Sequence, residues 1–129
     1  MRIDKPWGYE EWFAQTDKYV GKVLFVKEGH SLSLQYHERK DETLYILDGM
    51  AGFTIDGKCT IEIGGRSVHI LPLVEHRVEA IVDTTIIEVS TPEVNDIVRL
   101  KDNYGRVTEA AMKADLTVLV SGGFDPRRI

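Results

Sequence analysis

Hydrophobic and polar residues alternate with a period of two through much of this 129-residue chain, and turn-forming residues interrupt the alternation. Because successive side chains of a strand point to opposite faces of a sheet, this pattern predicts strands. We expect them at residues 8–13, 18–26, 31–37, 43–47, 52–55, 59–63, 67–71, 77–80 and 84–90. Between two of them, Asp56-Gly57 predicts a tight hairpin, since primed turns need positive φ. Gly64-Gly65 predicts a second turn.

Helical signals are confined to a short turn at residues 95–99 and an Ala-rich segment at residues 107–114. Many short strands joined by Gly-rich turns are typical of a sandwich or a closed barrel, so we predict an all-β fold. The length suits one compact domain with its own core. Because the composition shifts after Arg106, we assign residues 1–107 to the β domain and residues 108–129 to a C-terminal extension.

The composition limits the classes of partner and the location that we expect for this protein. The net charge is −5 and the basic residues are scattered among acids, which argues against a nucleic-acid partner. Cys59 is the single cysteine, so no intrachain disulfide forms, and we expect it to be a small buried or strand residue. No apolar run is long enough to span a membrane, and the first residues lack the apolar core of a signal peptide. We therefore expect a cytoplasmic location and no membrane partner.

Four polar residues form a candidate metal site. If residues 31–37 form a strand, Gln35 and His37 share one face of it, and Glu42 follows at the next strand. His76 lies far along the chain beside another turn, and a barrel can bring it to the same place. Two imidazoles, a carboxylate and an amide oxygen suit one divalent ion, Zn²⁺, Mn²⁺, Fe²⁺, Co²⁺ or Ni²⁺. Binding should weaken as the pH falls and the imidazoles take up protons.

The spacing of these residues resembles the two cupin motifs. Five residues separate Gly29 from Gln35, and ten separate Gly65 from His76. The Gln-x-His pair that ends at His37 is similar to that of phosphomannose isomerases. The resemblance implies a cupin-type jelly-roll β-barrel.

Further segments resemble the isomerase domain of type II phosphomannose isomerase/mannose-1-phosphate guanylyltransferase enzymes. They are Lys5-Pro6-Trp7-Gly8, Leu32-Ser33-Leu34-Gln35, His76-Arg77, Asp96-Ile97-Val98-Arg99 and Asp102-Asn103-Tyr104-Gly105-Arg106. The chain departs from these patterns at three places. Leu71-Pro72-Leu73 stands where cupins have Pro-x-Gly, Ala80 stands in place of an Asn, and Lys40 in place of an Arg. We expect the turn that aims His76 to differ from that of the family.

The resemblance implies aldose–ketose isomerisation, such as mannose 6-phosphate to fructose 6-phosphate through an enediolate, in activated-sugar or polysaccharide synthesis. A metal would polarise the carbonyl, a base would move a proton, and cations would hold the phosphate of the sugar-phosphate substrate. The candidate catalytic residues are Lys40, Arg77 and Glu79, with Asp96 and Asp102 as weaker candidates for the base. The candidate substrate-binding residues are Trp7, Arg99, Asp102, Tyr104 and Arg106.

Two other functions remain open, because a cupin fold hosts many chemistries. One is a cupin that binds a sugar or sugar nucleotide without turnover, and the other is an Fe²⁺ dioxygenase. Small cupins commonly pair through sheet faces, so the resemblance also implies a homodimer. Residues 116–126 resemble the first strand and glycine turn of cytidylyltransferases, but the catalytic histidines of that family do not follow. We expect a remnant of a fused nucleotidyltransferase, or an extra strand that pairs with a partner subunit.

Overall fold

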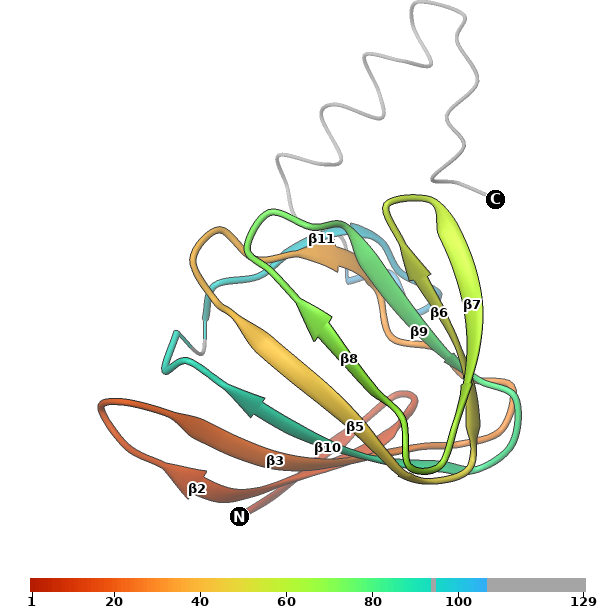
Figure 1. Ribbon diagram of the computed structural model, residues 1–129, viewed down its shortest axis with the longest axis horizontal. Helices are drawn as coiled ribbons and strands as arrows, with labels where there is room; N and C mark the ends of the chain where they lie inside the picture. Colours follow the sequence, from red (N-terminus) through yellow and green to blue (C-terminus); the bar gives the residue numbers. More distant parts are fainter. Residues whose placement is uncertain (94, 107–129) are drawn as a thin grey trace, which may run out of the picture.

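The computed structural model describes residues 1–93 and 95–106, and in this part of the chain all regular structure is β-strand (Figure 1). The strands are β1 (Arg2–Lys5), β2 (Gly8–Gln15), β3 (Val20–Val26), β4 (Leu34–Tyr36), β5 (Glu42–Asp48), β6 (Met50–Ile55), β7 (Lys58–Ile63), β8 (Ser67–Ile70), β9 (His76–Ala80), β10 (Thr84–Ser90) and β11 (Val98–Lys101). The all-β prediction is confirmed. Among the described residues no helix has the length and apolar character that crossing a bilayer demands.

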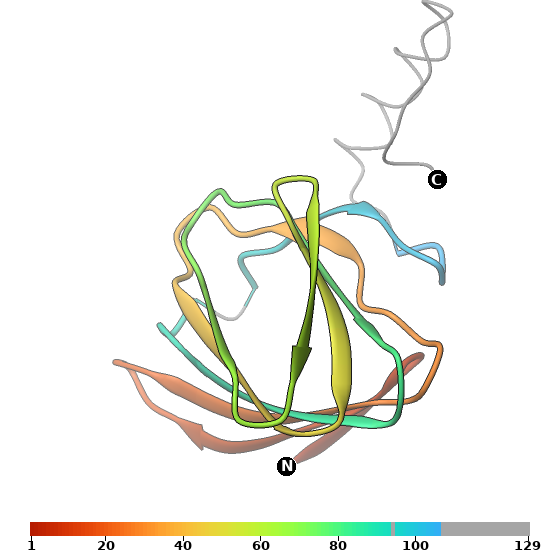
Figure 2. The ribbon, with the colours of Figure 1, turned by 45° about the vertical axis from the view of Figure 1, so that its right-hand side comes forward.

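The strands form two antiparallel sheets that face each other and curve around a shared interior (Figure 2). One sheet has the order β1-β2-β3-β10-β5-β8, and the other has the order β11-β4-β9-β6-β7. Strand β10 matches its predicted bounds, and the other predicted strands occur with ends shifted by up to three residues. The alternation did not predict β1 and β11, which are four-residue edge strands.

The helical turn predicted at residues 95–99 is wrong. Val98–Lys101 is strand β11, and Arg99 lies opposite Gln35 of β4 in the sheet. Strand β4 is only three residues long and its other side pairs with β9. Pairing with β11 gives the remaining backbone groups of β4 their partners, and that need outweighs the weak local helical signal.

The predicted hairpin between β6 and β7 is confirmed. Ile55 pairs with Lys58, and the two residues between them, Asp56 and Gly57, have φ of 48° and 82°. Two successive positive φ angles are what a type I′ turn requires, and its twist matches that of the strands. The turn at Gly64-Gly65 between β7 and β8 is confirmed as well.

The hydrophobic core lies between the sheets because alternate residues of the strands point inward. The side chains of Phe53, Ile46 and Ile86 are wholly buried there. Trp7, which precedes β2, is 3% exposed and packs against the same cluster. Polar residues replace the apolar ones on the inward face toward one end of the barrel, and this end carries the site described below.

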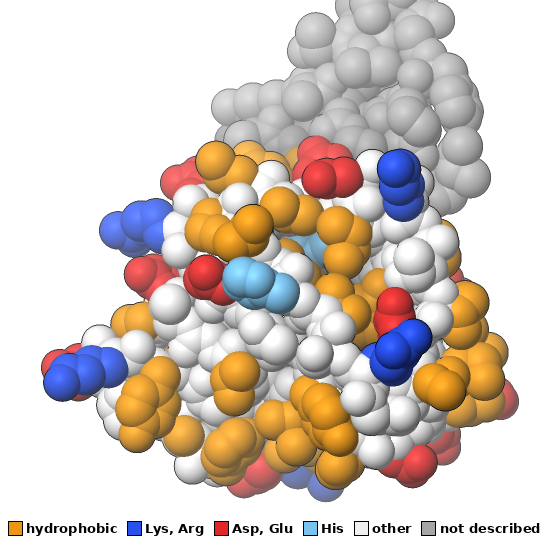
Figure 3. Space-filling view, in the orientation of Figure 1, with side chains coloured by type: hydrophobic (Ala, Val, Ile, Leu, Met, Phe, Trp, Pro, Cys, Tyr) orange, Lys and Arg blue, Asp and Glu red, His pale blue; other side chains and the backbone are white. Residues whose placement is uncertain are grey.

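The outer surface is not uniformly polar. Figure 3 shows hydrophobic side chains in several patches between charged ones on the face that carries β5, β8 and β9. Cys59 lies in β7, in agreement with the expectation of a strand residue, and its side chain is exposed. The predicted helix at residues 107–114, the extension 108–129 and the cytidylyltransferase-like segment lie outside the described residues.

Candidate metal centre

His37, Glu42 and His76 converge at the polar end of the barrel. His37 directly follows β4, Glu42 begins β5 and His76 begins β9, so three chain segments each contribute one side chain. Nε2 of His76 lies 3.3 Å from Oε1 of Glu42, and Nε2 of His37 lies 3.7 Å from the same oxygen. One donor atom from each residue falls within 4.8 Å of the others, and all three residues are buried. This spacing is that of donors around a common point.

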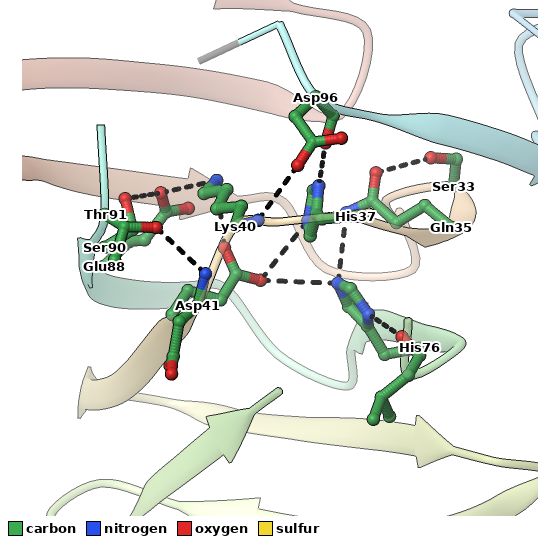
Figure 4. A network of polar contacts seen from close by, with 12 residues as sticks. Ser33, Gln35, His37, Lys40, Asp41, His76, Glu88, Ser90, Thr91 and Asp96 are labelled. Atoms are coloured by element: carbon green, nitrogen blue, oxygen red, sulfur yellow. Dashed lines mark hydrogen bonds and ion pairs between the residues drawn. The ribbon is translucent and has the colours of Figure 1, made fainter. Parts of the chain in front are cut away.

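The backbone fixes which ring nitrogen each histidine presents (Figure 4). Nδ1 of His76 donates to the carbonyl of Val74 at 2.9 Å, and Nδ1 of His37 donates to the carbonyl of Asp96. A carbonyl oxygen can only accept a hydrogen bond, so Nδ1 of each histidine carries the hydrogen. In a neutral ring, Nε2 then carries a lone pair. Such backbone contacts orient metal-binding histidines in general.

The arrangement needs a positive charge at its centre. Two Nε2 lone pairs and a carboxylate oxygen would repel one another at these distances unless a cation or added protons lay between them. Nε2 of His37 is buried and has no hydrogen-bond partner among the described residues. Imidazole nitrogens with one carboxylate suit divalent transition metals. The residues present therefore fit the metal ion expected from the sequence.

Gln35, the fourth predicted ligand, lies beside the three others. It occupies the register position opposite His76 on β9, and its Nε2 lies 3.5 Å from Nε2 of His76. Its Oε1 accepts a hydrogen bond from Oγ of Ser33 at 3.0 Å. Ligation requires this amide to turn so that Oε1 faces the ion, and the hydroxyl of Ser33 can still accept from the amide nitrogen after the turn.

A buried lysine balances the carboxylate of the centre. Nζ of Lys40 lies 3.0 Å from Oε2 of Glu42 and 3.0 Å from Oε2 of Glu88. Burial alone would lower the pKa of Lys40, but the two carboxylates raise it above its ordinary value. Burial alone would raise the pKa of Glu42, but contacts from His37 and His76 and the charge of Lys40 hold it well below its ordinary value. Glu42 is therefore anionic and Lys40 cationic at neutral pH.

Asp96 holds the loop between His37 and Glu42. Its carboxylate accepts hydrogen bonds from the backbone amides of Glu38, Arg39 and Lys40, at 3.0, 2.6 and 2.9 Å. These bonds lower the pKa of Asp96 although burial opposes the shift. The residue is thus engaged in positioning the loop, and its carboxylate is unavailable as the base considered from the sequence.

The turn before His76 is built without a glycine. The amide of Val74 donates to the carbonyl of Leu71, which closes a four-residue turn with Pro72 second and Leu73 third. Leu73 has a φ of 69°, in the region where glycine is normally found at this turn position. The amide of Leu73 also donates to the carbonyl of His37, which ties this turn to the other ligand segment.

Replacing Leu73 with glycine is expected to raise the free energy of unfolding by about 1 kcal/mol, because a positive φ costs a non-glycine residue roughly 1–2 kcal/mol and glycine loses more entropy on folding. Leu73 is 66% exposed, so little packing is lost. Urea unfolding of the two proteins measures the difference. A variant less stable than the parent would contradict this account of the turn.

The centre opens into a cavity of about 490 Å³ between the two sheets. Charged residues of the six-stranded sheet line it, namely Lys5, Glu10, Lys22, Glu42 and Glu88, together with Lys40 from the loop before β5. The sequence analysis missed Glu10, Lys22 and Glu88. Their signal was a charged residue at an inward position of an alternating strand, as Lys22 is between Val20 and Leu24. Such a cavity suits a small polar ligand.

The predicted substrate and catalytic residues separate into two groups. Trp7, Lys40, Arg99 and Arg106 line the cavity. Asp102 does not, but it holds Arg106 through contacts of 3.0 and 3.2 Å from Nε and Nη2 of the guanidinium.

The second group lies away from the cavity. Tyr104 contacts Nδ1 of His30 through its hydroxyl at 2.7 Å. Arg77 donates to the carbonyl of Leu32 and to Asn103, and Glu79 is exposed. Because His76 points inward at the start of β9, Arg77 and Glu79 fall on the outer face of the strand.

The family and the relatives that this chain matches agree with one another. Residues 1–102 match the family described as mannose-6-phosphate isomerase C-terminal. Mannose-1-phosphate guanylyltransferase of Escherichia coli (strain K12) is 34% identical over 110 residues, covering 81% of this chain and 23% of that protein. The alginate biosynthesis protein AlgA of Pseudomonas aeruginosa is 32% identical over 116 residues, covering 86% of this chain and 24% of that protein. The chain thus spans about a quarter of the length of these curated relatives.

Solved structures agree on the fold. An RmlC-like cupin from Shewanella frigidimarina superposes with a TM-score of 0.67 at 16% sequence identity, covering 73% of this chain and 85% of that chain. At this identity the likeness concerns the fold alone. The cupin-type β-barrel predicted from the sequence is confirmed.

Proposed function

Because the chain belongs to the mannose-6-phosphate isomerase C-terminal family, we propose that it is a metal-dependent sugar-phosphate isomerase. The proposed substrate is mannose 6-phosphate or a closely related aldose phosphate, converted to the ketose in the cytoplasm for activated-sugar synthesis. The observation that carries the proposal is the convergence of His37, Glu42 and His76 on one point at the wall of a cavity that two arginines also line.

The ligand set proposed for one divalent ion is Gln35, His37, Glu42 and His76. When bound, such an ion would polarise the substrate carbonyl and lower the cost of an enediolate. The chain's own residues bind and orient the sugar. Lys40 brings a fixed ammonium group to within 3.0 Å of the Glu42 carboxylate, where it can donate to a substrate oxygen. Trp7, buried in the core, supports the wall of the cavity.

Arg99 and Arg106 are proposed to hold the phosphate. Both line the cavity, and Arg99 is the register partner of Gln35, about 4.8 Å away across the sheet. Burial lowers the pKa of Arg99, and the nearby positive charge of Arg106 lowers it further, which indicates two guanidinium groups in a partly buried setting. A dianionic phosphate relieves their repulsion and accepts paired hydrogen bonds from each.

Replacing Arg106 with lysine is expected to raise the KM for the sugar phosphate about tenfold, because lysine keeps the charge but loses the two-pronged contacts with Asp102 and with phosphate. The turnover number and metal affinity should change little, since Arg106 is not among the proposed ligands. Steady-state kinetics measures KM and the turnover number. Arg66→Lys, which changes an exposed side chain, is the control. An unchanged KM would remove Arg106 from the phosphate site.

The proposal is tested by assaying purified, metal-free protein against mannose 6-phosphate after loading with Zn²⁺, Mn²⁺, Co²⁺, Fe²⁺ or Ni²⁺ in turn. Turnover with at least one metal supports an isomerase. Saturable binding of the sugar phosphate without product, with metal bound, would instead favour a binding cupin. Oxygen consumption by the iron form would favour a dioxygenase. Light scattering of the same protein tests the expected homodimer.

A further inference from the structure

Isomerisation of an aldose phosphate needs a base that carries a proton between neighbouring carbons, and none of the base candidates from the sequence is available for it. The following inference rests on the isomerase function proposed above. A carboxylate suited to this role is buried, lines the cavity and lies close to Glu42. Glu88 on β10 meets these conditions: it is 5% exposed and lies in the cavity wall.

Glu88 lies one strand away from the proposed ligand Glu42. Strand β10 pairs with β5, so Ser90 is opposite Glu42 and Glu88 is opposite Leu44. Oε2 of Glu88 and Oε2 of Glu42 each lie 3.0 Å from Nζ of Lys40, so these two oxygens are at most about 6 Å apart. Glu88 therefore lies in the same part of the cavity as the metal centre, where it can contact a sugar bound at that centre.

The closest contacts of Glu88 are made by one of its two oxygens (Figure 4). Oε2 accepts a hydrogen bond from Oγ of Ser90 at 3.2 Å and faces the ammonium groups of Lys40 and Lys22, at 3.0 and 4.0 Å. Each of these three contacts is made by Oε2, and Oε1 makes none of them. The carboxylate is thus held firmly by one oxygen while the other is open to a substrate.

Other carboxylates are less suited to this task. Glu79 is exposed on the outer face, Asp96 is engaged by three backbone amides, and Asp102 is paired with an arginine. Glu10 lines the cavity but lies on β2, three strands from β5 in the sheet order. At about 4.8 Å per strand this is roughly 14 Å along the sheet, too far from the metal centre for proton transfer.

We propose that Glu88 is the catalytic base of the isomerisation. Its Oε1 takes the proton from C2 of the aldose, the C2–H electron pair forms a C1–C2 double bond, and the carbonyl electron pair moves to O1. Glu88 then returns the proton to C1, while the hydroxyl proton passes from O2 to O1 and a carbonyl forms at C2. The same atoms and electrons are present at both ends, so no external oxidant or reductant takes part.

The test compares the metal-loaded parent with Glu88→Gln, Glu88→Asp and Glu79→Gln in D₂O. Glu88→Gln should lower kcat by about 10²- to 10⁴-fold and abolish deuterium incorporation at the transferred position. Its metal content, and its affinity for mannitol 6-phosphate measured by calorimetry, should stay within about twofold of the parent. Glu88→Asp should recover part of the exchange, and Glu79→Gln on the outer face should behave as the parent.

Three outcomes of this experiment would contradict the proposal, each at a different point. Glu88→Gln with kcat and exchange near those of the parent would overturn the role of Glu88 and leave the isomerase intact. A loss of kcat that tracks an equal loss of metal or of mannitol 6-phosphate affinity would also overturn it, because Glu88 would then only hold Lys40 in place. A parent protein without turnover or exchange on any metal would overturn the isomerase itself, and the base with it.

Discussion

Replacing Glu42 with glutamine is expected to lower the metal affinity of the protein by more than about 100-fold, beyond the 10- to 100-fold typical of changes outside the ligand shell. Glu42 is the one anionic residue in the proposed ligand set, and its pKa is held well below the ordinary value, so it is charged at neutral pH. Glutamine has the same shape but no charge. The imidazoles of His37 and His76 would then face a neutral amide.

Thermal stability with and without metal measures this effect. At a metal concentration 100 times the parent's Kd, binding stabilises the parent by about 2.7 kcal/mol, and a 100-fold weaker variant by only about 0.4 kcal/mol. The matched control is Glu28→Gln, since Glu28 has an exposed side chain. A Glu42→Gln variant that metal still stabilises as strongly as the parent would show that the carboxylate is not a ligand.

Replacing Lys40 with methionine is expected to lower the free energy of unfolding of the metal-free protein by about 3–5 kcal/mol, because removing one partner of a buried ion pair leaves uncompensated charge. Lys40 is 7% exposed, and its Nζ lies 3.0 Å from a carboxylate oxygen of both Glu42 and Glu88. Its raised pKa has the same origin, since the two carboxylates favour its charged form more than burial opposes it.

Urea unfolding at pH 7 measures this loss, with the exposed Lys58→Met as the control. The loss should shrink as the pH falls toward 4, because protons can then neutralise the carboxylates that have lost their cation. Bound metal should also reduce this loss of stability, because its positive charge compensates the negative charge of the Glu42 carboxylate. A loss under about 1 kcal/mol at pH 7, equal to that of the control, would contradict the buried network described above.

Local patterns were sufficient to predict much of the fold. Alternation gave the strands because most have one buried face, and the Asp56-Gly57 turn followed from its need for positive φ. Gln35 and His37 share a face for the same reason. The register that brings them to His76 depends on pairing across the barrel, which the family spacing encodes and the local pattern does not.

The remainder of the site depends on tertiary contacts. Strand β11 forms because the edge of β4 needs partners, and it brings Arg99 to the cavity. Leu73 adopts a conformation usual for glycine because hydrogen bonds hold the turn, and His76 lies with His37 and Glu42 although this segment departs from the family's motif. Arg77 and Glu79 share a face of β9. Because His76, the residue before Arg77, points inward, that face is the outer one.

Calorimetric titration of the metal-free protein tests most directly whether the chain holds one divalent ion between His37, Glu42 and His76. The parent should bind one Zn²⁺ or Mn²⁺ per chain and release protons in doing so, because the histidines must be neutral to ligate. The His37→Ala/His76→Ala double variant should bind none. Equal metal content in the parent and the double variant would contradict the account.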